Sequence, residues 1–272
     1  MSQSLQTKSP PKLSTIDEAK NVKTSSFPKY IMEGLGVFLI CYTCGYAAIW
    51  NTEGSGDFNG AILANPAVIF IVISLGADIS GAHYNPAVSF TLYYFNLLPL
   101  STLYAYILSQ LTGSMLAGLV LTITRPAHFP DNPRLVNNLG QCTLANGISV
   151  WIGLFTEIIA AGLLLFTVMH TVSTKMPTYR SAYIVSFLIA CNNYAFAGIS
   201  GCCMNPARTL GLSVFAGRGM DRGWWIYYLG DMLGGWIGGY AYYYLFVQGS
   251  DKDWMIEKRR SLAMSSTNKI SV

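Results

Sequence analysis

Long apolar segments separated by short polar ones make up most of this chain. The first, residues 30–50, holds 21 mostly apolar residues, enough at about 1.5 Å per residue to cross a hydrocarbon core of about 30 Å. The second contains Pro66 and is shorter, which a kinked helix buried among neighbours tolerates. In the last segment, Gly230, Gly234 and Gly238 recur every four residues, which predicts close contact with another helix. The pattern predicts six membrane-spanning helices, at residues 30–50, 60–76, 101–124, 148–170, 181–199 and 224–247.

Two further apolar segments, residues 87–94 and one that ends near Gly217, are too short to cross a membrane. Each follows a loop of small residues and begins with the tripeptide Asn-Pro-Ala. Asn is a favoured N-cap, and Pro is favoured at the first helical position because an N–H would have no partner there. The sequence therefore predicts two re-entrant half-helices that start at Asn85-Pro86-Ala87 and Asn205-Pro206-Ala207.

The order of these segments repeats, once in residues 29–124 and again in residues 148–247. Glu33 precedes Asn85 by 52 residues, and Glu157 precedes Asn205 by 48. Because each half has three spans, an odd number, the second half enters the membrane upside down relative to the first. Two half-helices of about 14 Å each would then meet at the midplane. The predicted fold is an all-α membrane protein with six transmembrane helices and two re-entrant half-helices in an inverted repeat.

The two Asn side chains suggest what the half-helices do. If each side-chain oxygen caps its own helix, the amide NH2 is free to donate toward a pore. The helix N-termini add partial positive charge at the same place, which disfavours cations. Non-helical backbone at this depth must be buried or line a wet cavity, so the residues before each Asn are expected to present carbonyls to the pore. The sequence thus predicts a channel for neutral small molecules.

Composition and charge support a membrane protein and give its orientation. The chain is 52% hydrophobic and only 11% charged, which is typical of polytopic membrane proteins. Residues 1–28 and 249–272 are polar and predict disordered tails around a channel domain of residues 29–248. Residues 1–29, the tail of residues 249–272 and the link of residues 171–180 together hold 12 of the 17 basic residues, so this side is predicted to be cytoplasmic. The positive charge lies mostly in tails rather than on a folded stripe, so no nucleic-acid partner is expected.

The cysteines and histidines do not form a recognisable metal or redox pattern. Cys41, Cys44 and Cys191 lie in apolar spans and are expected to be small core residues. Cys202 and Cys203 are adjacent rather than spaced as CxxC, and the chain has only three histidines. No metal or cofactor is expected. The chain also lacks a constellation of nucleophile, base and metal, which excludes an enzyme.

The motifs SGAHYNPAV and NPAR, together with Glu33, Glu157 and Gln110, resemble those of the aquaporin, or major intrinsic protein, family. The resemblance extends over about residues 28–248. A third copy, Asn65-Pro66-Ala67, lacks the small-residue loop, so it is the matched pair in an inverted repeat that is specific. The resemblance implies a homotetramer in the lipid bilayer with one pore per subunit. It also implies that Glu33 and Glu157 brace the loops.

The resemblance further implies a selectivity filter on the outer side of the Asn-Pro-Ala centre. Arg208 matches the filter arginine and Cys202 the loop position beside it. Asn65 falls where water-selective members usually have an aromatic residue, and Asn193 where they usually have His; Asn192 is the alternative to Asn193. Loop residues expected to line the pore through their backbone are Gly81, Ala82, His83, Gly201 and Cys203.

The main functional prediction is passive transport of water, with exclusion of ions and protons. Two amides in place of a ring and an imidazole leave open a channel for glycerol, urea or ammonia. Thr209, Ser213, Tyr227 and Tyr228 match the water-selective branch instead. A coupled secondary transporter is a distant alternative, because no titratable cluster lies near either Asn. Asp231 is expected near the membrane interface. The protein is expected in the plasma membrane or in a vacuolar or vesicular membrane.

Overall fold

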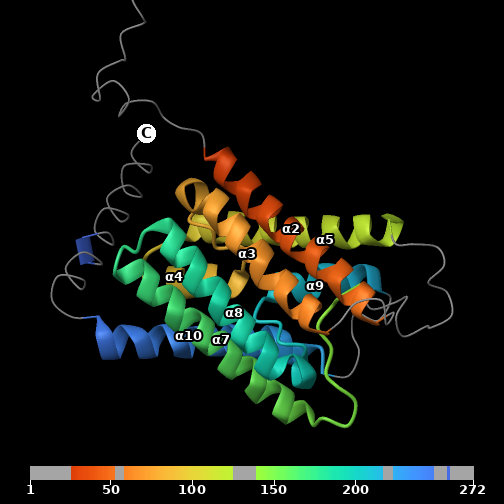
Figure 1. Ribbon diagram of the computed structural model, residues 1–272. Coiled ribbons are helices and arrows are strands. Elements are labelled where there is room, and N and C mark those ends of the chain that lie inside the picture. Colours follow the sequence, from red (N-terminus) through yellow and green to blue (C-terminus); the bar gives the residue numbers. More distant parts are fainter. Residues whose placement is uncertain (1–25, 53–57, 125–138, 217–222, 248–255, 258–272) are drawn as a thin grey trace, which may run out of the picture.

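The computed structural model describes residues 26–52, 58–124, 139–216, 223–247 and 256–257 (Figure 1). The predicted tails, 1–28 and 249–272, therefore lie almost wholly outside the described residues. The described chain folds into long helices and two short ones, with connecting loops. The helices are α2 (Phe27–Thr52), α3 (Phe58–Ser80), α4 (Pro86–Tyr94), α5 (Leu100–Thr124), α7 (Val150–Ser173), α8 (Thr178–Ser200), α9 (Pro206–Ala216) and α10 (Trp225–Phe246).

The predicted spans and half-helices correspond to these helices one by one. Five of them, α2, α3, α5, α7 and α8, are long and apolar enough to cross a membrane. The sixth, α10, has 22 residues and matches its predicted bounds closely, but its glycines, tyrosines and Asp231 make it less apolar. The largest difference is in α3, which continues four residues beyond the predicted end at Gly76, to Ser80, and contains Pro66.

The helices form two sets with the same internal arrangement. In the first set α2 packs against α3 and α5, and in the second α7 packs against α8 and α10. The two sets meet where α3 packs on α8, α5 on α9 and α4 on α10 (Figure 1). Each short helix thus packs on a long helix of the other half, so the half-helices join the two halves together.

Glycines let α7 and α10 approach closely, as their spacing predicts. A Cβ atom added to Gly234 would lie 2.3 Å from the backbone oxygen of Ile158, and one added to Gly238 would lie 1.9 Å from that of Gly162. A Cβ atom added to Gly230 would lie 3.0 Å from the Cβ of Glu157. The contact between the two helices therefore excludes side chains at these positions of α10.

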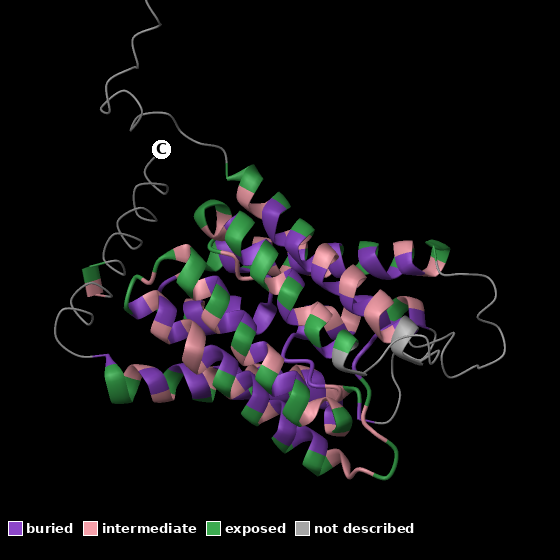
Figure 2. Cartoon of the chain, in the orientation of Figure 1, coloured by how far each residue is buried: buried purple, intermediate pink, exposed green. Residues whose placement is uncertain are grey.

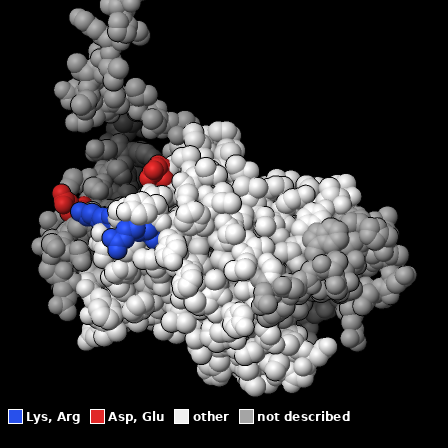
Figure 3. Space-filling view, in the orientation of Figure 1, with Lys and Arg blue, Asp and Glu red and all other residues white. Residues whose placement is uncertain are grey.

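Burial is inverted relative to a water-soluble protein. Large apolar side chains such as Leu108, Ile123 and Phe155 are exposed on the outer faces of the helices, whereas Glu33 and Glu157 are fully buried (Figure 2). Charged groups among the described residues on the face seen in Figure 3 gather at one end of the molecule, and the other described residues on that face are uncharged. Both features fit a chain surrounded by lipid.

One expectation about a single residue is wrong. Cys191 is exposed on α8 rather than part of the core, because it lies on the face of that helix that points away from its neighbours. Asp231 is fully buried within α10. Cys41 and Cys44 are buried, as expected.

The all-α fold with two half-helices positions two loops, residues 80–84 and 200–204, in the middle of the molecule. They connect α3 to α4 and α8 to α9. The candidate site is built around them.

Candidate functional site

The two central loops have the same backbone conformation. In each, a glycine ends the preceding long helix in the left-handed region and donates its N–H to the carbonyl oxygen four residues earlier, over 3.0 Å for Gly81 and 3.1 Å for Gly201. A left-handed φ is uncommon for residues other than glycine, yet each loop has two more. They are Ala82 (φ 52°) and Tyr84 (φ 51°) in one loop, and Cys202 (φ 49°) and Met204 (φ 55°) in the other.

Glu33 on α2 holds the first loop through its carboxylate. One oxygen accepts hydrogen bonds from the Ser80 hydroxyl (2.7 Å) and the N–H of His83 (2.9 Å). The other accepts from the N–H of Tyr84 (2.6 Å) and from the side-chain amide of Gln110 on α5 (2.9 Å). These bonds satisfy loop donors that would otherwise be unpaired inside a membrane.

Glu157 on α7 does the same for the second loop. It accepts from the Ser200 hydroxyl (2.6 Å), from the N–H of Cys203 at both oxygens (3.0 Å each) and from the N–H of Met204 (3.1 Å). The geometry of both glutamates agrees with the bracing role that the resemblance implies. The two glutamates occupy matching places, since Glu33 is the seventh residue of α2 and Glu157 the eighth residue of α7.

Asn85 and Asn205 each cap their own half-helix and also bond to the opposite loop. The side-chain oxygen of Asn85 accepts from the N–H of Ala87 (2.8 Å), and that of Asn205 accepts from the N–H of Ala207 (3.1 Å). Each amide nitrogen then donates to the opposite loop, from Asn85 to the Met204 carbonyl (2.6 Å) and from Asn205 to the Tyr84 carbonyl (2.8 Å).

This cross-connection corrects the expectation of a wholly free amide. One hydrogen of each NH2 group is used by the other loop, and an amide has a second one. The carbonyls of Tyr84 and Met204, directly before each Asn, accept these bonds and so hold the half-helices end to end. Sequence reasoning missed the bonds because they join residues about 120 positions apart.

A cavity of about 440 Å³ runs from both Asn residues to the link between α7 and α8. Its wall includes Gly81, Ala82 and His83 of the first loop. Apolar side chains at helical spacing on α3 and α8 form much of the remainder, namely Ile69, Ile73, Val185 and Ile189. Gly201 and Cys203, also expected to line a pore, are not part of this cavity, because their loop lies on the other side of the Asn pair.

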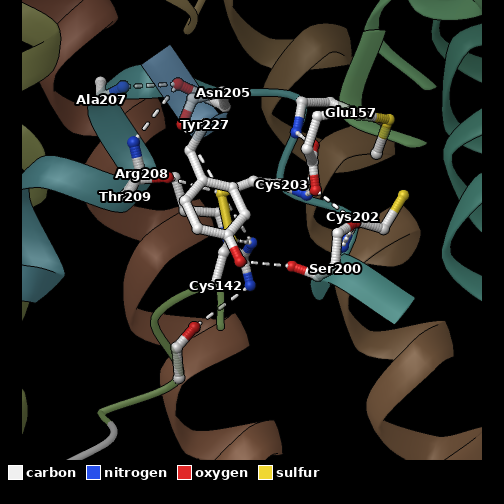
Figure 4. The surroundings of a disulfide bond; sticks show 12 residues. Cys142, Glu157, Ser200, Cys202, Cys203, Asn205, Ala207, Arg208, Thr209 and Tyr227 are labelled. Carbon is white, nitrogen blue, oxygen red and sulfur yellow. Dashed lines mark hydrogen bonds between the residues drawn. A yellow bond between two sulfur atoms is a disulfide. The ribbon is translucent and has the colours of Figure 1, made fainter. Parts of the chain in front are cut away.

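Arg208, three residues after Asn205, is held by the segment before α7. Its guanidinium donates to the carbonyl of Gly140 (3.2 Å) and contacts the sulfur atoms of Cys142 and Cys203. Those two cysteines form a disulfide bond, shown with Arg208 in Figure 4. The side chain of Cys203 is thereby engaged in a covalent link that the sequence did not reveal.

The disulfide attaches a buried loop segment to the second central loop. Leu139 is only 1% exposed, and a Cβ on Gly140 would lie 2.6 Å from the Cα of Gly45 on α2. The N–H of Ala145 donates to the carbonyl of Ile199 (3.0 Å). The segment thus packs tightly between α2 and the second loop, beside Arg208.

The remaining expected filter residues lie on α3, on α8 and in the second loop. Asn65 is half-buried on α3, one turn before the cavity-lining Ile69, and its side-chain oxygen has no hydrogen-bond partner among the described residues. Cys202 is a buried free thiol. Asn193 is buried on α8, one turn after Ile189.

Asn192 and Asn193 have different surroundings. The Asn192 amide donates to the carbonyl of Ala160 on α7 (3.0 Å) and lies 3.2 Å from the sulfur of Met204. Asn192 is therefore engaged between helices, whereas Asn193 continues the row of residues on α8 that lines the cavity. Over the described residues, no group of three or more His, Cys, Asp or Glu side chains could hold a metal ion.

Comparisons with known proteins agree with this architecture. The family model described as "Major intrinsic protein" matches residues 20–242. "Probable aquaporin NIP4-2" of Arabidopsis thaliana is 33% identical over 224 residues, 80% of this chain and 74% of that protein. "Aquaporin-8" of Notomys alexis is 30% identical over 226 residues, 80% of this chain and 83% of that protein.

A solved structure shares the fold. The aquaglyceroporin from Plasmodium falciparum superimposes with a TM-score of 0.72 at 23% identity, covering 82% of this chain and 97% of that one. The predicted inverted repeat of spans and half-helices is confirmed by this likeness and by the helices described above. With the family model matching most of the chain, the conclusion is that this chain belongs to the major intrinsic protein, or aquaporin, family of membrane channels.

Proposed function

We propose that this protein is a channel that lets water cross a membrane passively, down osmotic gradients, and excludes ions and protons. The observation that carries the proposal is the pair Asn85 and Asn205, which line one end of a cavity while each caps its own half-helix.

The electrostatics at the Asn pair support passage of neutral molecules. α4 and α9 both begin there, so the positive ends of two helix dipoles meet at one place. The second hydrogen of each amide is a donor for a passing oxygen atom. A water molecule there accepts from both sides, whereas a cation meets an unfavourable field. The wall toward the link of α7 and α8 is mostly apolar, which keeps interactions elsewhere weak.

The filter is proposed to consist of Asn65, Asn193, Cys202 and Arg208. Arg208 supplies a fixed positive charge beside the second loop, and the two Asn side chains supply polar groups without ring bulk. This composition is the specific reason to keep a second candidate function, a channel for glycerol, urea or ammonia. The relatives include proteins called aquaporins and one called an aquaglyceroporin, so their names support both candidates.

The disulfide supports an orientation in the membrane. Disulfides persist in oxidising compartments, so the side of Cys142 and Cys203 is proposed to face the cell exterior or an organelle lumen. The link between α7 and α8, with exposed Lys175 and Arg180, then faces the cytoplasm, as do both tails. A plasma membrane or a vacuolar or vesicular membrane fits this arrangement. Assembly as a homotetramer, implied by the resemblance, remains a prediction.

Stopped-flow measurements on proteoliposomes test the proposal. We expect osmotic shrinkage several-fold faster than in protein-free vesicles, with no rise in proton conductance measured by an internal pH dye. Uptake of glycerol, urea and ammonia, measured in parallel, tests the second candidate function, a channel for these solutes. Shrinkage equal to that of empty vesicles would overturn the water channel, and fast glycerol uptake with slow water flow would favour the broader solute channel.

A further inference from the structure

The internal repeat extends from the two loops into the helices that pack behind them, α5 and α10. The hydroxyl of Tyr106 on α5 donates to the carbonyl of Ser80, and that of Tyr227 on α10 donates to the carbonyl of Ser200 (2.8 Å). Ser80 and Ser200 occupy the same place in their loops. Tyr106 and Tyr227 are therefore counterparts, 121 positions apart.

A second pair of contacts fixes the same register. A Cβ on Gly113 of α5 would lie 2.0 Å from the backbone oxygen of Gly34, the residue after Glu33. A Cβ on Gly234 of α10 would lie 2.3 Å from the backbone oxygen of Ile158, the residue after Glu157. Gly113 and Gly234 are again 121 positions apart. The helices behind the loops thus repeat residue by residue.

This register makes Asp231 the counterpart of Gln110. The amide nitrogen of Gln110 donates to Glu33 (2.9 Å) and to the hydroxyl of Ser89 (3.1 Å), so it links the bracing glutamate to the half-helix α4. In the second half, Asp231 occupies the place of this donor beside Glu157. An amide donor in one half is replaced by a carboxyl group in the other.

The surroundings of Asp231 do not suit a carboxylate. The residue is fully buried, and neither side-chain oxygen has a hydrogen-bond partner among the described residues. The ionisable groups around it are Glu157 on α7, Arg208 at the start of α9, the thiol of Cys202, and Tyr227 and Tyr228 on its own helix.

Arg208 is the cation among these groups and favours a charge on Asp231, but no hydrogen bond joins the two side chains. The guanidinium of Arg208 donates to Gly140 and lies against the disulfide. Glu157 already accepts hydrogen bonds from the second loop at both oxygens. Two adjacent buried carboxylates would repel strongly in a medium of low dielectric constant.

We infer that Asp231 holds a proton at neutral pH and donates it in a hydrogen bond to Glu157, as the amide of Gln110 does to Glu33. Asp231 is then a positioning residue, because it orients the glutamate that holds the second loop and, through that loop, Asn205. It acts from behind the loop and does not line the cavity described above. The inference deepens the proposed channel function and rests on it for its effect on permeability.

Three variants and infrared spectroscopy test this assignment. Asp231→Asn keeps the shape and supplies a neutral donor, so water permeability should stay within about twofold of the parent. Asp231→Leu removes the donor and should lower permeability several-fold. Gln110→Leu is the matched control in the first half and should cause a loss of the same size. The permeability of each variant is normalised to the amount of protein that remains monodisperse in detergent. Misfolded protein is then not counted.

The infrared measurement reports the proton itself. The purified parent protein at neutral pH should show the carbonyl stretch of a protonated carboxylic acid, which shifts in heavy water and is absent from Asp231→Asn. Absence of this band in the parent, its persistence in Asp231→Asn, or equal losses of permeability in Asp231→Asn and Asp231→Leu would overturn the inference. Since the band does not depend on transport, its presence in a protein without water permeability would refute the proposed function alone.

Discussion

At the scale of single residues, we propose that selectivity depends on a few side chains beyond the Asn pair. Asn65 on α3 and Asn193 on α8 each lie one turn from a cavity-lining residue, Ile69 and Ile189 respectively. Asn65 Oδ1 is buried and has no hydrogen-bond partner among the described residues. Arg208, by contrast, is fixed by the loop segment at Gly140 and Cys142.

Restoring bulk at these two positions should narrow the channel. We predict that Asn65→Phe combined with Asn193→His lowers glycerol and urea uptake at least several-fold and changes water permeability by less than about twofold. The reason is that a ring and an imidazole fill space that larger solutes need, while water still passes. Paired uptake and osmotic assays on the same vesicles check this. Asn192→His is the matched control, and an equal effect of both changes would contradict the prediction.

Also at this scale, the disulfide should stabilise the fold and hold Arg208. Closing a loop between Cys142 and Cys203, which are 61 positions apart, restricts the unfolded chain, so replacing both by Ser should cost about 2–5 kcal/mol of stability. We expect a lower thermal midpoint in detergent and a higher ratio of glycerol to water permeability, because Arg208 loses a neighbour on each side.

The control for this prediction is Cys191→Ser, which changes an exposed free thiol on the outer face of α8. It should leave both the midpoint and the permeability ratio unchanged. If the double Cys→Ser variant behaves like Cys191→Ser, the disulfide neither stabilises the protein nor positions the arginine.

At the scale of the helices, each half contains one pair of long helices that pack closely against each other. α10 approaches α7 through Gly230, Gly234 and Gly238, and α5 approaches α2 through Gly113 and Gly34. The glutamates that brace the loops are next to these contacts. Close helix packing and loop position are therefore set together.

A methyl group at such a contact should separate α7 from α10. Gly238→Ala places a Cβ 1.9 Å from the backbone oxygen of Gly162, which cannot move as a flexible side chain can. We expect a loss of about 1–3 kcal/mol in stability from the forced shift of backbone. Thermal unfolding in detergent, followed by circular dichroism, measures it.

Gly198→Ala on α8 is the matched control, because nothing lies within 4 Å of its added Cβ. Alanine is the better helix former, so this change should be neutral or stabilising by up to about 1 kcal/mol. Equal destabilisation by both substitutions would show that the glycines are not needed for packing.

At the scale of the whole molecule, the two halves are held together by exchanged contacts. Each half-helix packs on the other half, and each Asn amide donates to the opposite loop. One end carries the disulfide, and the opposite end carries the link between α7 and α8, with its basic residues.

This polarity predicts which side of the membrane each end faces. In intact cells, an epitope at the C-terminus should be reached by antibody only after permeabilisation. Labelling of the C-terminal epitope on intact cells would contradict the proposed orientation, and an epitope inserted between residues 130 and 135 is the positive control for the outer side.

The sequence by itself determined the helices, the half-helices and their inverted order. These follow from local properties: the length of apolar runs, the capping preference of Asn before Pro, and an odd number of spans per half. The bracing by Glu33 and Glu157 entered through family resemblance, since a buried charge in a span needs partners that spacing alone does not identify.

Only the tertiary structure decided the contacts between residues far apart in the chain. The bonds from Asn85 to Met204 and from Asn205 to Tyr84, the pairing of Cys142 with Cys203, and the burial of Asp231 against Glu157 all depend on how helices of the two halves approach. No local pattern encodes these partners, because the bonds form across the molecule rather than along a helix. The repeat in the sequence predicts where the two loops lie along the chain. The packing of the helices determines which residues the loops contact.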